Sequence, residues 1–285
     1  MVKRRFEEDV RVSYSETEIV NSIDDIRHPV IREALRLLGL KSNLEIVSVG
    51  DVPAETGLGS SGSFTVGLLH ALHAFKNENP SRQKLAEEAC RLEMEILKEP
   101  CGVQDPYIAA FGGFICLDIA KDGRVNISPL RMSDDAVHEL EINLLFFYTG
   151  IKRSASLVLQ DQGKSIENDG EALEAMHSIK EIGLRVKHAL ERGNLTEFGK
   201  LQHEHWMAKK CTSPQIANGP IDRWYERGLE SGAIGGKLMG AGGGGFLVFY
   251  CENGRDRLRK AMARESLREV NFGFEREGSK IVINL

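Results

Sequence analysis

Apolar positions along the chain follow helical spacing in some segments and strand spacing in others. Between Pro29 and Gly39 they recur every three to four residues, which predicts a short amphipathic helix that begins at a proline and ends before a glycine. The same spacing predicts further helices, and short continuous apolar runs predict strands. The predicted helices cover residues 61–75, 82–98, 106–111, 154–162, 171–192, 195–210, 220–231 and 254–265. The predicted strands lie near residues 10–15, 44–49, 114–119, 125–127, 142–148, 245–251, 270 and 281.

This order of elements predicts an α+β fold. A doubly wound parallel sheet would need strands and helices in regular alternation, and the chain lacks that alternation. A polar segment at residues 132–136 separates two halves of the pattern. We therefore expect an N-terminal domain at residues 1–135 and a C-terminal domain at residues 136–285.

Each half contains one glycine-rich segment. Residues 53–64 have the sequence PAETGLGSSGSF, and residues 235–246 have the sequence GGKLMGAGGGGF. Because an ordered glycine loses more backbone freedom than any other residue, such runs indicate either disorder or a backbone that another group approaches closely. The second segment leads directly into the apolar run FLVFYC, which is typical of a buried strand and not of a linker. We therefore expect the second segment to be ordered.

The first glycine-rich segment predicts a phosphate-binding loop. Its GLGSS stretch precedes a predicted helix, and free N–H groups at a helix start, with the hydroxyls of Ser60 and Ser61 beside them, can hold phosphate oxygens. The chain lacks the Walker spacing GxxxxGK[ST], and it lacks GxGxxG between a strand and a helix, so this is a different kind of nucleotide loop. The alternative is an ordinary loop before a serine-capped helix, and the second segment favours the phosphate loop.

Composition limits the class of protein and its partners. With 41% apolar and 28% charged residues, the 285-residue chain is an ordinary globular protein. Its net charge of −5 and its scattered basic residues give no stripe for nucleic acid. The apolar run INLLFF is too short to cross a membrane. The five cysteines are widely spaced without a CxxC pair, so we expect reduced thiols and a soluble cytoplasmic protein.

Glu93 projects from the apolar face of the helix predicted at residues 82–98. A carboxylate is rarely buried without a partner, because burying an uncompensated charge costs several kcal/mol. One interpretation is a structural ion pair with an arginine. The other is a magnesium ion that bridges nucleotide phosphates, since Mg²⁺ commonly takes one or two protein ligands together with waters and phosphates.

Asp105 lies in the sequence EPCGVQDPY, directly before Pro106. An aspartate before a proline at a helix start is often an N-cap, which stabilises the helix by about 1 kcal/mol. The functional interpretation is a carboxylate that orients a substrate hydroxyl or takes its proton beside the phosphate site. One residue can do both.

Two further segments carry candidate polar groups. His203 and His205 lie on a predicted helix, where their side chains point about 200° apart, so we assign no metal there and expect one buried or capping histidine and one exposed histidine. Arg153 follows a predicted strand. It is either a solvated loop charge or a guanidinium that binds phosphate or sugar oxygens.

Taken in order, PxxxGLGSS, Glu93, GVQD and KLMGAGGGG resemble the GHMP kinase superfamily of galactokinases, homoserine kinases, mevalonate kinases and phosphomevalonate kinases. The resemblance covers nearly the whole chain. VRVSYSETE, HPVIREAL, EPCGVQD, YTGIKRSAS and GGKLMGAGGGGF most resemble the branch with D-glycero-D-manno-heptose 7-phosphate kinase, which phosphorylates an anomeric sugar hydroxyl. The resemblance implies two α+β lobes, the first like ribosomal protein S5 domain 2 and the second ferredoxin-like.

The resemblance also implies roles for single residues. Ser61 and Glu93 would hold Mg²⁺, Asp105 would be the catalytic base, and the second glycine-rich segment would pack against the phosphate loop and the substrate. The implied ATP-binding residues are Pro53, Gly57, Leu58, Gly59, Ser60, Ser61 and Gly62. The implied residues near the substrate and the phosphate loop are Arg153, Gly240, Ala241, Gly242, Gly243 and Gly244.

The chain departs from the family pattern in two places. Members usually carry, ahead of the VRVSYS region, a hairpin with a basic residue and a glycine-rich segment that ends in an acidic residue, and no such segment precedes it here. Pro106 stands where the heptose branch commonly has glutamine. The expected function is ATP- and Mg²⁺-dependent phosphorylation of a sugar or sugar phosphate, with a homodimer as one possible assembly. The alternatives are a kinase for fucose or galactose, and a truncated nucleotide-binding protein without catalysis.

Overall fold

The computed structural model describes residues 1–52 and 56–284, which divide into two compact units. The N-terminal unit contains residues 1–52, 59–113 and 275–284, and the C-terminal unit contains residues 56–58 and 114–274. The phosphate-loop segment therefore contributes to both units. The domain boundary after residue 135 stays a prediction.

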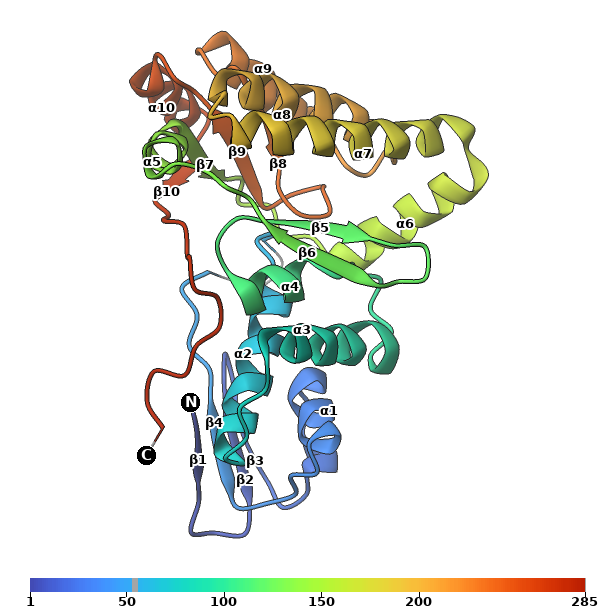
Figure 1. Ribbon diagram of the computed structural model, residues 1–285, viewed down its shortest axis with the longest axis vertical. Helices are drawn as coiled ribbons and strands as arrows, with labels where there is room; N and C mark the ends of the chain where they lie inside the picture. Colours follow the sequence, from blue (N-terminus) through green and yellow to red (C-terminus); the bar gives the residue numbers. More distant parts are fainter. Residues whose placement is uncertain (53–55, 285) are drawn as a thin grey trace. The chain divides into compact units, whose positions relative to one another are not determined.

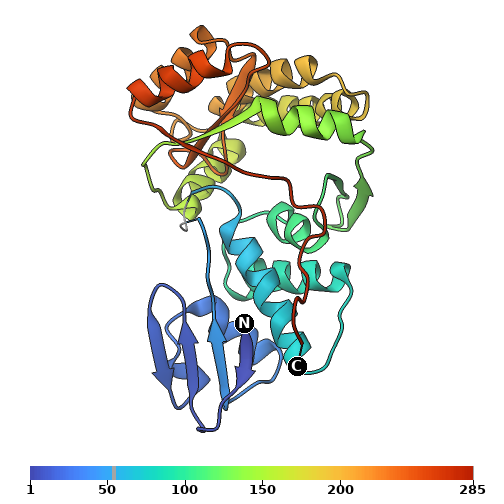
Figure 2. The ribbon, with the colours of Figure 1, turned by 90° about the vertical axis from the view of Figure 1, so that its left-hand side faces the viewer.

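A four-stranded sheet forms one side of the N-terminal unit (Figure 2). Its strands follow the order β1-β4-β2-β3, with β2 and β4 parallel and the other neighbours antiparallel. Alternating residues of β2, Val10 and Val12, are fully buried, as expected for a strand with one face on a core. The third strand follows a tight turn that the apolar pattern did not predict. The strands are β1 (Val2–Arg4), β2 (Val10–Ser13), β3 (Thr17–Val20) and β4 (Leu44–Val47).

The helices of the N-terminal unit largely follow the predicted spacing. The helix predicted at residues 82–98 is the exception, because it changes from α to π geometry after Cys90. Leu69 and Leu72 of α2 and Leu85 and Leu92 further along are fully buried. The elements are a short 3-10 helix (Ile23–Asp25), α1 (Pro29–Leu37), α2 (Ser60–Phe75), α3 (Arg82–Cys90), a π-helix (Arg91–Ile96) and α4 (Gln104–Phe111).

The last residues of the chain return to the N-terminal unit, where both ends of the chain lie (Figure 2). The backbone N–H of Gly113 donates to the carbonyl of Glu275, and that of Ser279 donates to the carbonyl of Ala109. The strand predicted near residue 281 is wrong, because no described residue after Val270 belongs to a strand. An added Cβ at Gly112 would overlap the backbone of Gly278, so the two segments pack main chain against main chain.

The C-terminal unit is built on a second four-stranded sheet, with the order β10-β7-β9-β8 and antiparallel neighbours throughout (Figure 1). All five residues of β9 are buried, as its apolar sequence predicts. Strand β8 lies inside the second glycine-rich segment. The apolar pattern missed it because glycines occupy positions where a side chain would meet β9; a Cβ at Gly236 would overlap the carbonyl of Val248. The strands are β7 (Leu144–Tyr148), β8 (Gly235–Leu238), β9 (Phe246–Tyr250) and β10 (Arg268–Val270).

Six helices and a hairpin complete the described part of the C-terminal unit. Its core includes Trp206, Leu247 and Phe249. The polar residues at 132–136 are not a simple linker, because Ser133 caps helix α5 by accepting from the N–H of Ala136 at 3.2 Å. The elements are β5 (Ile115–Ile119), β6 (Val125–Pro129), α5 (Asp134–Asn143), α6 (Ala155–Asn168), α7 (Gly170–Glu191), α8 (Leu195–Lys210), α9 (Gly219–Glu230) and α10 (Arg255–Arg264). The α+β prediction is confirmed.

Among the helices that the structure describes, none combines the length and apolar character needed to cross a bilayer.

Candidate active site

Helix α2 begins at the end of the first glycine-rich segment. Its N-cap is Gly59, which has a left-handed backbone (φ +70°) and offers no side chain to the first N–H groups of the helix. A helix start leaves these N–H groups without intrahelical partners, and they point toward any anion placed there. Ser60 and Ser61 are the first two helical residues. This local geometry fits the predicted phosphate loop.

Glu93 is buried beside the start of α2, with 3% of its surface exposed. Its Oε1 accepts hydrogen bonds from Ser61 Oγ at 2.6 Å and from Thr65 Oγ1 at 2.9 Å. Within residues 1–52 and 56–284, no lysine, arginine or histidine forms an ion pair with Glu93. The arginine ion pair considered from the sequence is therefore wrong, and hydroxyl groups satisfy this carboxylate.

The backbone around Glu93 is a π-helix. Leu97 N–H donates to the carbonyl of Leu92, five residues back, instead of four. Single π turns inside helices are frequent at functional sites, because the extra residue changes the direction of the side chains around it. A regular α period therefore predicts that Glu93 is buried, but it does not predict the backbone that carries it.

Asp105 lies against the same end of α2. A Cβ at Gly59 would be 3.1 Å from Asp105 Cγ, and a Cβ at Gly62 would be 2.8 Å from Asp105 Cβ and 2.9 Å from the nitrogen of Pro106. The distances at residue 62 are too short for a real Cβ, so only glycine lets the two backbones approach this closely. At residue 59 the contact is tight, and the left-handed backbone also favours glycine. The glycines at 59 and 62 thus place a carboxylate next to the open N–H groups of α2.

The N-cap interpretation of Asp105 is wrong. Helix α4 begins at Gln104, its cap residue is Val103, and no side chain caps it. Asp105 is partly buried and makes no hydrogen bond or ion pair within the described part of the chain. Burial, and then the nearby charge of Glu93, raise the pKa of Asp105 above its ordinary value. An unpaired carboxylate with a raised pKa is a better proton acceptor than an ordinary aspartate.

Part of the first glycine-rich segment, residues 56–58, belongs to the C-terminal unit and packs there against the second glycine-rich segment. A Cβ at Gly240 would be 2.5 Å from Gly57 Cα, and a Cβ at Gly57 would be 2.7 Å from the carbonyl oxygen of Met239. Gly57 and Gly240 both have left-handed backbones, with φ of +79° and +69°. The two glycine-rich segments are thus packed backbone on backbone at this point.

Arg153 lies beside the second segment. Its Nη2 donates to Gln215 Oε1 at 2.8 Å, and a Cβ at Gly243 would be 2.7 Å from Arg153 Cδ. The hydrogen bond to Gln215 fixes the orientation of the guanidinium. Because residue 243 has no side chain, the methylene groups of Arg153 can pack against its backbone. Of the other predicted positions, Gly242 and Gly244 approach Ile216 and Ile151 closely, Leu58 and Ala241 are partly buried, and Pro53 is outside the described residues.

Comparison with known proteins identifies the family. The models of the N-terminal and C-terminal domains of GHMP kinases match residues 26–113 and 186–268. D-glycero-alpha-D-manno-heptose 7-phosphate kinase of Campylobacter jejuni is 33% identical over 231 residues, which are 81% of this chain and 68% of that protein. This chain belongs to the GHMP kinases. It is therefore an ATP-dependent phosphotransferase.

Two further matches place this GHMP kinase more broadly. Galactokinase of Pyrococcus furiosus is 26% identical over 271 residues, which are 85% of this chain and 73% of that protein. The crystal structure of a D-glycero-D-manno-heptose 1-phosphate kinase from Bacteroides thetaiotaomicron has a TM-score of 0.79 and 22% identity, and it covers 99% of this chain and 87% of that one. The fold is the two-lobed α+β fold of the family.

Sequence reasoning missed Thr65 in this kinase. The threonine is fully buried and donates to Glu93 together with Ser61. Residues four apart lie on the same side of a helix, so the spacing of Ser61 and Thr65 was the available signal. Cys101 is a third neighbour, with its Sγ 4.0 Å from Glu93 Oε2. Burial and the charge of Glu93 raise the pKa of the Cys101 thiol to about 11, so it stays protonated.

The expectation of one exposed histidine on α8 is wrong, because both histidines are partly buried. His203 Nδ1 is 2.8 Å from the hydroxyl of Tyr225, and the two rings stack. His205 Nδ1 is buried without a hydrogen-bond partner in the described structure. No group of three or more acidic, histidine or cysteine side chains that could hold a metal is found among the described residues.

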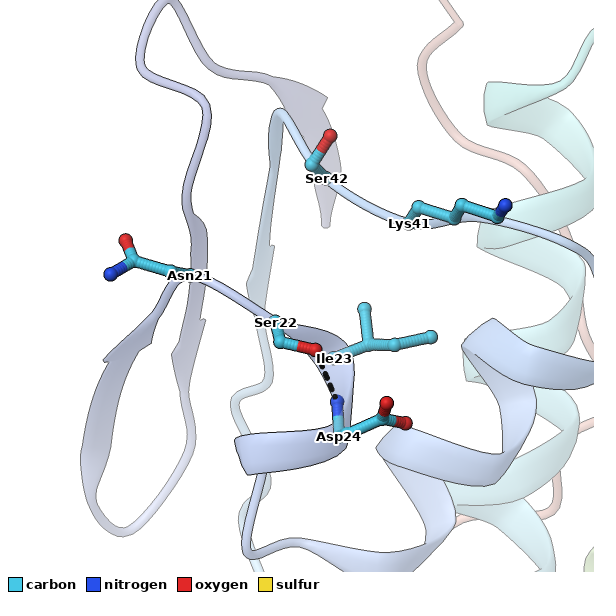
Figure 3. A pocket seen from close by; sticks show the side chains of 6 residues that line it. All are labelled: Asn21, Ser22, Ile23, Asp24, Lys41 and Ser42. Carbon is cyan, nitrogen blue, oxygen red and sulfur yellow. Dashed lines mark hydrogen bonds between the residues drawn. The ribbon is translucent and has the colours of Figure 1, made fainter.

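A surface hollow of the N-terminal unit lies outside the candidate site (Figure 3). Ser22 Oγ accepts from the N–H of Asp24 at 3.2 Å and caps the short 3-10 helix, and Asp24 pairs with Arg36. These contacts of Ser22 and Asp24 stabilise the local fold. None of the residues that line the hollow is a predicted site residue. The lining residues are Asn21, Ser22, Ile23, Asp24, Lys41 and Ser42.

Proposed function

We propose that this GHMP kinase transfers the γ-phosphoryl group of ATP to the C1 hydroxyl of a sugar phosphate, D-glycero-D-manno-heptose 7-phosphate. The 33% identical relative from Campylobacter jejuni supports this substrate. The similarity of VRVSYSETE, EPCGVQD and YTGIKRSAS to the heptose branch supports it as well.

The observation that carries the proposal is the position of Asp105. Its carboxylate is partly buried, unpaired among the described residues, and held against the start of α2 by Gly59 and Gly62. Phosphoryl transfer from ATP to a hydroxyl needs a group that orients the hydroxyl and accepts its proton next to the phosphate. Asp105 meets both requirements.

In the proposed reaction, Asp105 hydrogen-bonds the sugar hydroxyl and accepts its proton as the oxygen attacks. The new bond joins the C1 oxygen to the γ-phosphorus, and the bond from that phosphorus to the β,γ-bridging oxygen breaks, so ADP leaves with the electron pair. The N–H groups and hydroxyls at Ser60 and Ser61 would hold the phosphate oxygens in line for this transfer. Arg153 would contact sugar or phosphate oxygens through its guanidinium.

The residues around Glu93 fit a magnesium ion. They supply a carboxylate and two hydroxyls, from Ser61 and Thr65, and no competing cation among the described residues. Mg²⁺ prefers oxygen ligands and often takes only one or two from protein when phosphates supply others. When bound, it supplies positive charge that stabilises the negative oxygens of the transferring phosphoryl group. Ser61 and Glu93 would hold it.

An ADP-release assay over heptose phosphates, hexoses and mevalonate tests the substrate. We expect the highest kcat/KM with D-glycero-D-manno-heptose 7-phosphate. The similarity to galactokinase at 26% identity favours a second candidate, an unphosphorylated hexose such as galactose or fucose. A higher kcat/KM with such a hexose would contradict the heptose phosphate assignment and support the alternative.

A further inference from the structure

Helix α8 packs beside edge strand β8 in the C-terminal unit (Figure 1). These two elements carry three basic residues, His205, Lys209 and Lys237. His205 and Lys209 are four residues apart, so they lie on one face of α8. Lys237 comes from β8, next in sequence to the buried Leu238 and on the opposite face of the strand. Lys209 Nζ donates to the carbonyl of Gly240, which ties this group to the second glycine-rich segment.

No acidic side chain balances this cluster. Within the described residues, neither Lys209 nor Lys237 has a carboxylate at ion-pair distance, and His205 Nδ1 has no hydrogen-bond partner. Neighbouring polar groups of α8 are already engaged: Lys210 with Asp222, His203 with Tyr225, and Glu204 with Arg185. The positive charge of Lys237 is therefore not shared with the surrounding protein.

The surroundings change the ionisation of all three groups. Burial lowers the pKa of Lys237 to about 8, and burial together with the charge of Lys237 lowers that of Lys209 to about 8. Burial and the two lysines lower the pKa of His205 to about 3, so this ring is neutral. Placing two ammonium groups close together away from water is unfavourable, and an anion bound between them would offset that cost.

The two units thus carry chemically different anion sites. In the N-terminal unit, backbone N–H groups and hydroxyls at the start of α2 suit the phosphates of ATP. In the C-terminal unit, two ammonium groups suit a compact dianion. A kinase whose acceptor is itself a phosphate ester has to bind two separate phosphate-bearing ligands.

We propose that Lys209 and Lys237, with His205 beside them, bind the phosphate group that the sugar acceptor already carries. The inference rests on the proposed function, because it assigns the acceptor's own phosphate to these residues. It makes the cluster the part of the protein that distinguishes a sugar phosphate from a neutral sugar.

The first experiment is independent of the identity of the sugar. Inorganic phosphate is titrated calorimetrically into the wild type, Lys237→Met and the control Lys210→Met, each saturated with ADP so that the nucleotide site is filled. We expect phosphate binding by the wild type and the control, and a roughly tenfold to hundredfold loss in Lys237→Met. Equal binding by all three proteins would overturn the inference whatever the substrate is.

The second experiment compares D-glycero-D-manno-heptose 7-phosphate, the same heptose without phosphate, and ADP. We expect Lys237→Met to weaken the heptose 7-phosphate by a similar factor and to leave the other two ligands unchanged. An equal loss for ADP would assign the cluster to the nucleotide and overturn its assignment to the acceptor. Phosphate binding without any heptose 7-phosphate binding would contradict the proposed function and leave the phosphate site in place.

Two further measurements separate ligand binding from a structural role. Because burying the ammonium group is unfavourable, Lys237→Met should melt at the same temperature as the wild type or higher, and a clear drop would indicate a structural lysine instead. At pH 8 the lysines are partly deprotonated, and a bound dianion raises their pKa. The wild type should therefore take up protons when phosphate binds, seen as a calorimetric enthalpy that depends on the buffer, and the absence of uptake would contradict the proposal.

Discussion

Each unit of this kinase contains a cluster of like charges, and the two clusters have opposite signs. In the N-terminal unit, Glu93 and Asp105 are close enough that the charge of Glu93 raises the pKa of Asp105. In the C-terminal unit, burial and then the charge of Lys237 lower the pKa of Lys209, and the second cause is the same kind of repulsion. Like charges weaken a fold, so a pair that is kept without counter-charges indicates a ligand of the opposite charge.

The two clusters differ in how their polar atoms are satisfied. Glu93 accepts hydrogen bonds from two hydroxyls, which hold its carboxylate in one position. The side chain of Lys237 has no hydrogen bond or ion pair within the described chain, so its ammonium group depends more on what binds there. In the acidic cluster, the carboxylate of Glu93 is held by hydrogen bonds from the protein. In the basic cluster, the ammonium group of Lys237 has no such partner among the described residues.

The largest expected effect comes from removing the charge of Asp105. Asp105→Asn keeps the shape of the side chain and removes the proton acceptor, so kcat should fall by roughly a hundredfold to ten-thousandfold while ATP affinity stays near normal. Burial disfavours the ionised form in the folded state, so the variant should be as stable as the wild type or more stable at pH 7. Steady-state kinetics and thermal melting check both points, with the exposed Asp118→Asn as control. Nearly unchanged turnover would contradict the role of base.

The next effect concerns the cation expected at Glu93. Glu93→Gln should weaken Mg-ATP binding by roughly tenfold to hundredfold and weaken metal-free ATP binding much less, because the carboxylate acts through the ion. Calorimetry with and without Mg²⁺ measures the difference. The exposed Glu95 lies on the same π-helix, and Glu95→Gln should change neither titration. Equal losses with and without Mg²⁺ would argue against a magnesium ligand.

A smaller effect tests the close approach that positions Asp105. Gly62→Ala would place a Cβ 2.8 Å from Asp105 Cβ, so the two backbones have to separate, at a cost of about 1–3 kcal/mol in stability and with reduced turnover. Gly67→Ala in the same helix meets nothing within 4 Å, and it should stabilise the protein by about 0.5–1 kcal/mol. Denaturant unfolding measures both changes. Similar stability for the two variants would show that the contact at residue 62 does not constrain the loop.

The smallest expected effect is on the pH profile. Because the pKa of Asp105 is raised, this carboxylate becomes protonated at a higher pH than an ordinary aspartate. As the pH decreases, kcat/KM should therefore begin to fall at a higher pH than it would with an ordinary aspartate base. The charge of Glu93 contributes to the rise, so the acidic limb should move to lower pH in Glu93→Gln. A limb that does not move would mean that the two carboxylates are not coupled.

The sequence predicted the parts of the site that follow from periodicity. Apolar spacing around residue 93 predicted a buried carboxylate, and the GLGSS stretch predicted a helix start that carries hydroxyls. The π turn was not predictable from the same spacing. It adds one residue to a single turn, and the apolar positions around it still follow the helical period closely. Asp105 resembled a cap by its neighbour Pro106, yet the helix begins one residue earlier, at Gln104.

Two features of the C-terminal unit, strand β8 and the basic cluster, depend on tertiary contacts and could not be predicted from the sequence. Strand β8 begins with two glycines because the backbone and side chains of its neighbours leave no room for a Cβ there, a reason that no local pattern contains. The basic cluster joins residues 209 and 237, which lie far apart in sequence, and only the packing of α8 beside β8 brings them together. The position of Thr65 could have been predicted from the sequence, because it lies four residues after Ser61 and therefore on the same side of the helix.

The return of residues 275–284 to the first unit has a consequence for how the protein is made. A ribosome releases the segment up to Gly113 long before it adds Gly278, which packs against Gly112, and Ser279, whose hydroxyl lies 2.9 Å from His70 Nδ1. The first unit can therefore begin to fold early during synthesis, but it gains its last backbone contacts only after the second unit has been translated. The unit that contains Asp105 is begun first and completed last.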